Sequence, residues 1–110
     1  MEPTELVRAY YRAIDAGEYD SLADLLAAEF VHHRPDRTLD GRDRFVRFMR
    51  EERPQPDTTH HLDRVYEPVE GGGEVAVRGR LEAADGDVLF GFVDVFTVDG
   101  HITELHTYTD

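Results

Sequence analysis

The first half of the chain has its apolar residues at helical spacing. Between Thr4 and Ala16 they recur every three or four positions, which places them on one side of a helix. The members of this stripe are Leu6, Val7, Tyr10, Ala13 and Ile14. Pro3 suits a first helical turn and Gly17 suits a C-terminal cap, so the pattern predicts an amphipathic helix between them.

A second, shorter helix is predicted after the first. It begins at Asp20 or Ser21, which are both good N-caps, and ends near Ala28 with its leucines facing inward. The next segment, Phe30–His33, is predicted to be extended and to stop before Pro35.

A third helix is predicted after a loop over residues 34–39. It begins at Asp40 or Gly41 and ends at Pro54, because proline cannot continue a helix. Its inner face carries Phe45, Phe48 and Met49.

From residue 58 onward the pattern changes to the alternation typical of strands. Strands are expected over residues 58–69, 74–83, 88–98 and 102–108, separated by the turn signals Gly71–Gly73, Asp85-Gly86 and Asp99-Gly100. The order of elements predicts one α+β domain, residues 1–110, with three N-terminal helices packed on a curved antiparallel sheet.

The last two strands can be paired from their turn. If Asp99-Gly100 is a two-residue turn, Val98 lies opposite His101 and Asp94 opposite Leu105. One face of the sheet then carries Phe90, Phe92, Asp94, Phe96 and Leu105. The other face, with Leu89, Val93, Val95, Ile102, His106 and Tyr108, is also too apolar to be left in water, so we predict a homodimer through it.

Composition narrows the possible partners and the compartment. The 110 residues include no cysteine, and 24 acidic residues against 12 basic ones give a net charge of -12. This charge disfavours binding to nucleic acid or to anionic membranes. Neither a signal peptide nor a membrane-spanning stretch is visible, so we expect a cytoplasmic protein. All the basic residues are arginine, which together with the acidic excess favours a halophilic cytoplasm over an ordinary acidic protein.

A single carboxylic acid stands among aromatic residues on the face expected to be buried. Asp94 has a phenylalanine two positions away on either side. Burial disfavours a charged carboxylate, so the acid is either neutral and able to donate a hydrogen bond, or paired with an arginine. Together with Tyr10 and the pair His32-His33, Asp94 predicts a cavity that binds a small apolar molecule.

Three features together resemble a known superfamily: the helix end Ile14-Asp-Ala-Gly17, the aromatic-rich third helix and the closing segment Val93–Glu104. They are similar to the nuclear transport factor 2-like superfamily, and within it to the branch of SnoaL-like polyketide cyclases and ketosteroid isomerases. The resemblance covers nearly the whole chain and implies a cone-shaped cavity between helices and sheet. This fold hosts isomerases, cyclases, epoxide hydrolases, dehydratases and pockets without catalysis, so it does not fix the reaction.

The resemblance implies roles for individual residues. Tyr10 looks like the tyrosine that donates to the substrate oxygen in ketosteroid isomerases, and Asp94 looks like their second donor. The base in that family is an aspartate directly before a proline. Here Arg34 precedes Pro35, and arginine cannot accept a proton at any working pH.

A histidine is therefore expected to move the proton. Polyketide-cyclase-like relatives often carry a histidine one position earlier, which makes His33 the expected general base. Adjacent residues on a strand point to opposite faces, so His32 and His33 cannot both face the cavity. The expected cavity lining is Phe45, Phe48, Met49, His60, Phe92, Phe96 and Leu105.

We expect an isomerase, cyclase or lyase that acts on an apolar carbonyl compound by general acid–base catalysis without a cofactor. The alternative is a ligand-binding or dimeric scaffold module without catalysis. An epoxide-hydrolase-like site needs an arginine between two carboxylates; Arg78 and Asp110 resemble two parts of it, but Arg80 replaces the first carboxylate. No metal is expected, because His60 and His61 are adjacent on a strand and diverge.

Overall fold

The computed structural model describes residues 1–53, 57–68 and 73–110. The first part of the chain forms α1 (Pro3–Ala16), α2 (Tyr19–Leu25), β1 (Leu26–His33), β2 (Thr38–Asp40), α3 (Arg42–Arg47) and the π-helical turn η1 (Phe48–Glu52). The second part forms β3 (Thr59–Tyr66), β4 (Glu74–Glu82), β5 (Val88–Asp99) and β6 (His101–Thr109).

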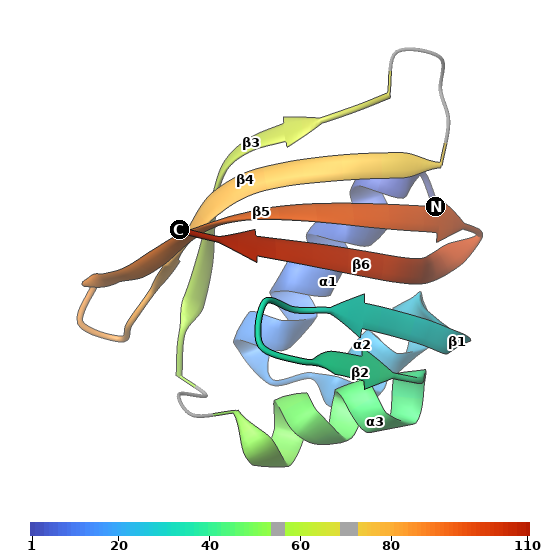
Figure 1. The fold of residues 1–110 in the computed structure, drawn as a ribbon, viewed down its shortest axis with the longest axis horizontal. Helices are drawn as coiled ribbons and strands as arrows, with labels where there is room; N and C mark the ends of the chain where they lie inside the picture. The colour runs from blue at the N-terminus through green and yellow to red at the C-terminus, as the bar shows by residue number, and fades with distance from the viewer. Residues whose placement is uncertain (54–56, 69–72) are drawn as a thin grey trace.

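The strands form one six-stranded sheet in the order β2-β1-β6-β5-β4-β3. Every neighbouring pair is antiparallel except β1 and β6, which run parallel. Figure 1 shows α1 crossing behind β4, β5 and β6, with α3 beside the hairpin of β1 and β2. The predicted α+β plan of three helices packed on a mostly antiparallel sheet is confirmed.

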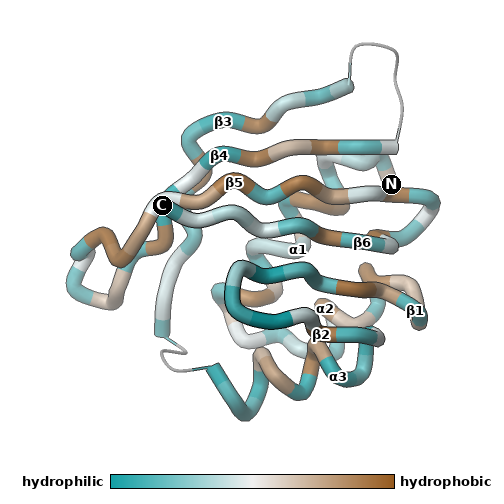
Figure 2. Tube along the Cα trace, in the orientation of Figure 1, coloured by the Kyte–Doolittle hydropathy of each residue, from teal (hydrophilic) through white to brown (hydrophobic). Residues whose placement is uncertain are grey.

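The first helix forms as its sequence predicts. Glu2 and Glu5 make a capping box at its start, and Gly17 ends it in the left-handed region at φ 70°. Its buried residues include the whole predicted stripe and, in addition, Tyr11. Figure 2 shows hydrophobic and hydrophilic positions alternating along β4 and β5, the strands whose apolar side chains meet this helix.

The second helix is shorter than expected because β1 begins early. α2 ends at Leu25, and β1 starts at Leu26 rather than at Phe30. Leu26 is fully buried and pairs with Ile102 of β6. This burial and pairing outweigh the helix propensity of the two alanines that follow. The short strand β2 lies in an expected loop and pairs with β1 through Leu39 opposite His32.

The predicted pairing of the last two strands is wrong by two residues at the site. Asp99 lies opposite His101 around Gly100, which has φ 75°, and a bulge leaves Thr103 without a partner on β5. The Thr103 hydroxyl donates to the carbonyl of Thr97 at 3.2 Å, which stabilises this bulge. The shift changes both the partner of Asp94 and the burial of Ile102.

First, Thr107 rather than Leu105 lies opposite Asp94. Second, Ile102, which was expected on the outer face, is fully buried against the helices. Leu105 keeps its expected burial because it pairs with Phe96 on the inner face.

A glycine on β4 makes room for an aromatic ring. Gly79 pairs with Phe92 of β5, and a Cβ at residue 79 would lie 2.8 Å from the Phe92 ring and 2.5 Å from the carbonyl oxygen of His61. Only a residue without a side chain lets the Phe92 ring come this close to β4.

Several expectations fall at the edges of what the structure describes. The expected helix end at Pro54, the strand end at Val69 and the turn residues Gly71 and Gly72 lie outside the described residues. Among the described residues, no helix is long and apolar enough to cross a membrane.

Candidate functional site

A cavity of about 300 Å³ lies between the helices and the sheet. Its apolar wall comes from α1, η1 and the strands, and consists of Ile14, Met49, Leu81, Leu89, Phe90 and Phe92. Leu89 was expected on the outer face of the sheet. Its polar wall includes Tyr10, His32, Arg34, His60, Asp94 and Thr107.

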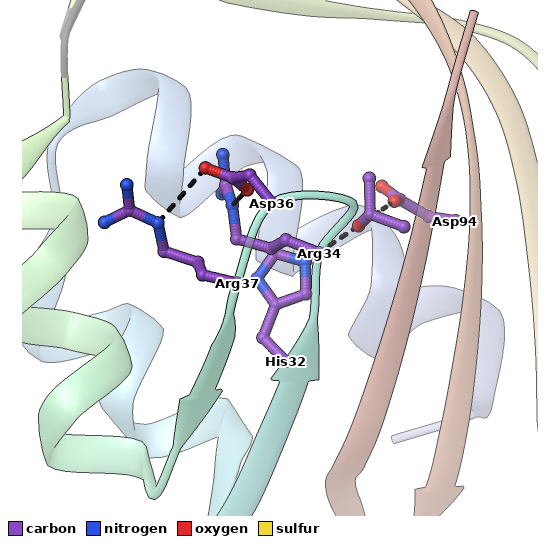
Figure 3. A network of polar contacts seen from close by, with 6 residues as sticks. His32, Arg34, Asp36, Arg37 and Asp94 are labelled. Carbon is purple, nitrogen blue, oxygen red and sulfur yellow. Dashed lines mark hydrogen bonds and ion pairs between the residues drawn. The ribbon is translucent and has the colours of Figure 1, made fainter.

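Asp94 is the buried carboxyl of this cavity, with 5% of its surface exposed. The Tyr11 hydroxyl donates to its Oδ2 at 2.6 Å, and the Thr107 hydroxyl donates to its Oδ1 at 2.5 Å. Thr107 Oγ1 is also 2.7 Å from His32 Nε2. Figure 3 shows the resulting chain of contacts running from His32 on β1 to Asp94 on β5.

The hydrogen bond from Thr107 to Asp94 bears on the tautomer of His32. A threonine hydroxyl has one proton, so when Thr107 gives it to Asp94, His32 Nε2 is the donor to Thr107 and Nδ1 carries no proton. Nδ1 is buried and has no hydrogen-bond partner in the part of the chain that the structure describes.

Burial changes the acid–base properties of both ends of this chain. Burial, then the Arg34 charge, lowers the pKa of His32 to about 3, so the imidazole is neutral. Burial raises the pKa of Asp94, although the hydrogen bonds from Thr107 and Tyr11 act in the opposite direction. Asp94 thus retains its proton at a higher pH than an ordinary aspartate does.

The two neighbouring tyrosines of α1 have different positions. Tyr10 lines the cavity, and among the described residues its hydroxyl has no hydrogen-bond partner. Burial, and next the Asp94 charge, raise the pKa of both hydroxyls well above the usual value. Both hydroxyls therefore stay protonated and can donate hydrogen bonds. Tyr11 donates to Asp94, whereas the Tyr10 hydroxyl is available to a ligand.

The prediction that His33 faces the cavity is wrong, because the alternation of β1 places its neighbour there. His32 is 3% exposed and lines the cavity. The side chain of His33 is 36% exposed and lies on the opposite face of the sheet, 2.9 Å from Glu104. His33 therefore cannot reach a molecule bound in the cavity.

A second histidine of the cavity is held by a carboxylate. His60 Nδ1 lies 2.7 Å from Asp15 Oδ1, and the backbone N–H of His60 donates to Asp15 Oδ2 at 3.0 Å. A carboxylate only accepts, so in the neutral imidazole this contact puts the proton on Nδ1 and leaves the lone pair on Nε2. The ring also contacts Tyr11 and Phe92, with centroids 5.1 and 5.7 Å apart, so its orientation is fixed.

Arg34 follows β1 directly and gives one side of the cavity a positive charge. Its Nε lies 3.5 Å from Asp36 Oδ1, an ion pair too long for a hydrogen bond, and Asp36 also pairs with Arg37 (Figure 3). The Arg34 guanidinium lies over the Phe48 ring at 5.0 Å.

The expected lining residues divide into two groups. Met49, His60 and Phe92 line the cavity. Phe45, Phe48, Phe96 and Leu105 do not, because they are packed in the core that supports it.

The residues considered for an epoxide-hydrolase-like site lie elsewhere. Arg78 and Asp110 are both exposed and line a separate depression that also includes Arg80. None of the three lines the cavity, so the structure does not bring an arginine and two carboxylates together there.

The three side chains that bond to Asp94 and His60 were missed from the sequence: Tyr11, Thr107 and Asp15. One signal was present, since Tyr11 and Asp15 are four residues apart and share a helix face. Thr107 could not be found because its position depends on the bulge at Thr103.

Helices packed on a mostly antiparallel sheet around a lined cavity define the class as the nuclear transport factor 2-like fold. The solved structure of such a protein of unknown function from Cytophaga hutchinsonii has a TM-score of 0.84 at 18% identity, over 100% of this chain and 91% of that one. The family follows from the sequence, because the model of the SnoaL-like domain matches residues 7–105. The chain belongs to this family.

Two further solved structures share the fold. A candidate polyketide cyclase of Sinorhizobium meliloti has a TM-score of 0.80 at 18% identity, over 94% of each chain. A candidate ketosteroid isomerase of Kribbella flavida has a TM-score of 0.78 at 23% identity, over 98% of this chain and 77% of that one. A comparison with curated proteins gave no match. At these identities the likeness establishes the fold alone.

Proposed function

We propose that this SnoaL-like chain is an enzyme that binds an apolar carbonyl compound and catalyses its isomerisation, cyclisation or elimination by general acid–base chemistry. One observation carries the proposal: a buried carboxyl with a raised pKa, a free tyrosine hydroxyl and a carboxylate-held histidine line one cavity. Groups with such complementary roles are characteristic of catalytic sites.

Tyr10 and Asp94 supply the hydrogen bonds to the substrate oxygen. Both groups are buried, and burial raises the pKa of each, which favours the protonated form that donates as negative charge develops on that oxygen. Preorganised donors in a site of low dielectric stabilise an enolate strongly, because they need no reorganisation during the reaction.

His60 replaces His33 as the proposed base. Its Nε2 lone pair is available, and the Asp15 carboxylate fixes the ring and stabilises the imidazolium that forms when Nε2 takes a proton from the carbon next to the carbonyl. His32 is less suited, because a pKa of about 3 makes it a weak base and its Nδ1 is buried in the protein.

The apolar wall favours an apolar substrate body. This wall consists of Phe90, Phe92, Met49 and three aliphatic side chains, and the cavity volume of about 300 Å³ suits a molecule of roughly one to three rings. Returning the proton to another carbon completes an isomerisation; attack of the enolate on a second carbonyl completes a cyclisation.

The test uses 2-tetralone, an apolar ketone with acidic hydrogens next to its carbonyl. Their exchange for deuterium in D2O is followed by proton NMR, with and without the protein. We expect Tyr10→Phe and Asp94→Asn to lower the catalysed rate by about 10²-fold or more, and His60→Ala by about 10²-fold. His61→Ala is the matched control, since His61 does not line the cavity.

A binding measurement separates the enzyme from the non-catalytic alternative. 2-Naphthol, whose oxygen resembles that of a planar enolate, is titrated into the protein by fluorescence. Binding that depends on Tyr10 and Asp94, without any catalysed exchange of 2-tetralone, would refute catalysis on simple ketones and favour a ligand-binding module.

We further propose that two chains associate through the outer face of the sheet. Val93 of β5 and Tyr108 of β6 pair there and are 39% and 58% exposed, which is high for large apolar side chains on central strands. Sedimentation equilibrium of the protein and of Val93→Glu tests this: a monomeric wild-type chain would contradict it. Function in a halophilic cytoplasm stays a prediction from composition.

A further inference from the structure

Three metal-ligating side chains gather on the sheet face opposite the cavity: His33, Glu104 and His106. None of them lines the cavity. They come from β1 and β6, the parallel pair in the middle of Figure 1. Their chemistry is therefore separate from the proposed enzymatic site.

Strand pairing brings these side chains together. His33 lies opposite His106 in the parallel register of β1 and β6. Glu104 precedes His106 by two residues on β6, so both point to the same face of the sheet. The backbone thus fixes all three Cα positions without any contribution from a loop.

The Glu104 carboxylate lies close to both imidazoles. Glu104 Oε2 is 2.9 Å from His33 Nε2, and Glu104 Oε1 is 3.6 Å from His106 Nε2. The imidazoles stack with centroids 4.2 Å apart and planes 15° apart. The three ligand atoms all lie within 4.8 Å of one another.

We propose that His33, Glu104 and His106 bind a divalent transition-metal ion of the zinc type. Two imidazole nitrogens and one carboxylate oxygen are ligands that such ions prefer, and water completes a tetrahedral site. The ion takes the place of the proton between His33 Nε2 and Glu104. Two neutral imidazoles and one carboxylate carry a charge of −1, which attracts a cation, and the acidic chain adds to this attraction.

Only small side-chain movements are needed. Zinc–ligand bonds of about 2.0–2.1 Å place tetrahedral ligands about 3.3 Å apart, so atoms now within 4.8 Å of one another must approach by at most about 1.5 Å. The stacked rings must also tilt so that both Nε2 lone pairs converge. Within a single chain the side chains of His33, Glu104 and His106 are 36%, 43% and 40% exposed, so no packing inside that chain opposes this rotation.

The test uses tag-free protein that has been freed of metal with a chelator. Zn²⁺ is titrated by isothermal calorimetry, and Co²⁺ by its visible absorption, which reports nitrogen and oxygen ligands in a tetrahedral site. Both titrations are repeated on His33→Ala, Glu104→Gln and His106→Ala. His101→Ala is the matched control, because His101 is an exposed histidine of the same strand outside the cluster.

We expect one Zn²⁺ per chain, and a loss of affinity of about tenfold or more in each of the three variants but not in His101→Ala. Circular dichroism melts identify any variant that fails to fold, and the other two then decide. Absence of binding, equal affinity in all variants, or one ion per two chains would each overturn a three-ligand site within one chain. The proposed acid–base function is unaffected by any of these results, because it depends on the opposite face.

Discussion

The buried histidine of the cavity gives protein stability a specific dependence on pH. The pKa of His32 is about 3 in the folded protein, against 6.5 for an ordinary histidine. The unfolded chain therefore binds more protons below pH 6.5, so this contribution to stability is complete above pH 6.5 and is lost as the pH falls toward 3. At 1.36 kcal/mol per pKa unit, the full loss is about 5 kcal/mol, and about 2 kcal/mol of it has occurred by pH 5.

His32→Gln isolates this effect. Glutamine cannot be protonated, but its amide N–H can still donate to the Thr107 hydroxyl in place of Nε2. Urea unfolding in chelator-containing buffer at pH 7.5 and 5.0 should show that the variant loses about 2 kcal/mol less free energy of unfolding than the wild type. His101→Gln serves as the exposed control and should behave as the wild type does.

Two results would refute this reasoning. One is a parallel loss of stability in the wild type and in His32→Gln, to within about 0.5 kcal/mol. The other is an NMR titration in which the His32 ring of the folded protein takes up a proton above pH 5.

Three further substitutions test the same network and its support. Thr107→Val removes the donor to Asp94 and should lower the free energy of unfolding in urea by about 2–4 kcal/mol, whereas Thr109→Val should stay within about 0.5 kcal/mol. Tyr11→Phe removes the other donor, so the pKa of Asp94 should rise further; a fall, followed by carboxyl infrared absorption against pH, would contradict the network. Gly79→Ala should destabilise by about 1–3 kcal/mol and weaken 2-naphthol binding, because the new Cβ would lie 2.5 Å from the His61 carbonyl oxygen and 2.8 Å from the Phe92 ring; an unchanged melting temperature would contradict this steric account.

The sequence predicts most of the fold because its periodic signals are local. The stripe of α1 and the alternation along β5 each depend on residues a few positions apart, and both appear where expected. The early start of β1 at Leu26 was missed, because it depends on pairing with a strand more than seventy residues away.

The site is harder to predict because one extra residue in a turn or bulge shifts the register of the whole strand that follows it. Alternation alone puts Asp94 on the inner face, but the bulge at Thr103 decides that Thr107 is its partner. The pairing of Asp15 with His60 joins a helix end to a distant strand, and no local pattern reports it. For His33, the resemblance pointed to the position and the strand geometry of β1 excluded it.

The backbone between His32 and His33 separates the two faces of the sheet. The His32 imidazole is buried on the inner face, and the His33 imidazole is partly exposed on the outer face. A substitution on one face of the sheet can consequently leave the other face intact, so the two faces can diversify independently during evolution. A deletion or insertion of one residue ahead of this pair would instead exchange their environments and disrupt both at once.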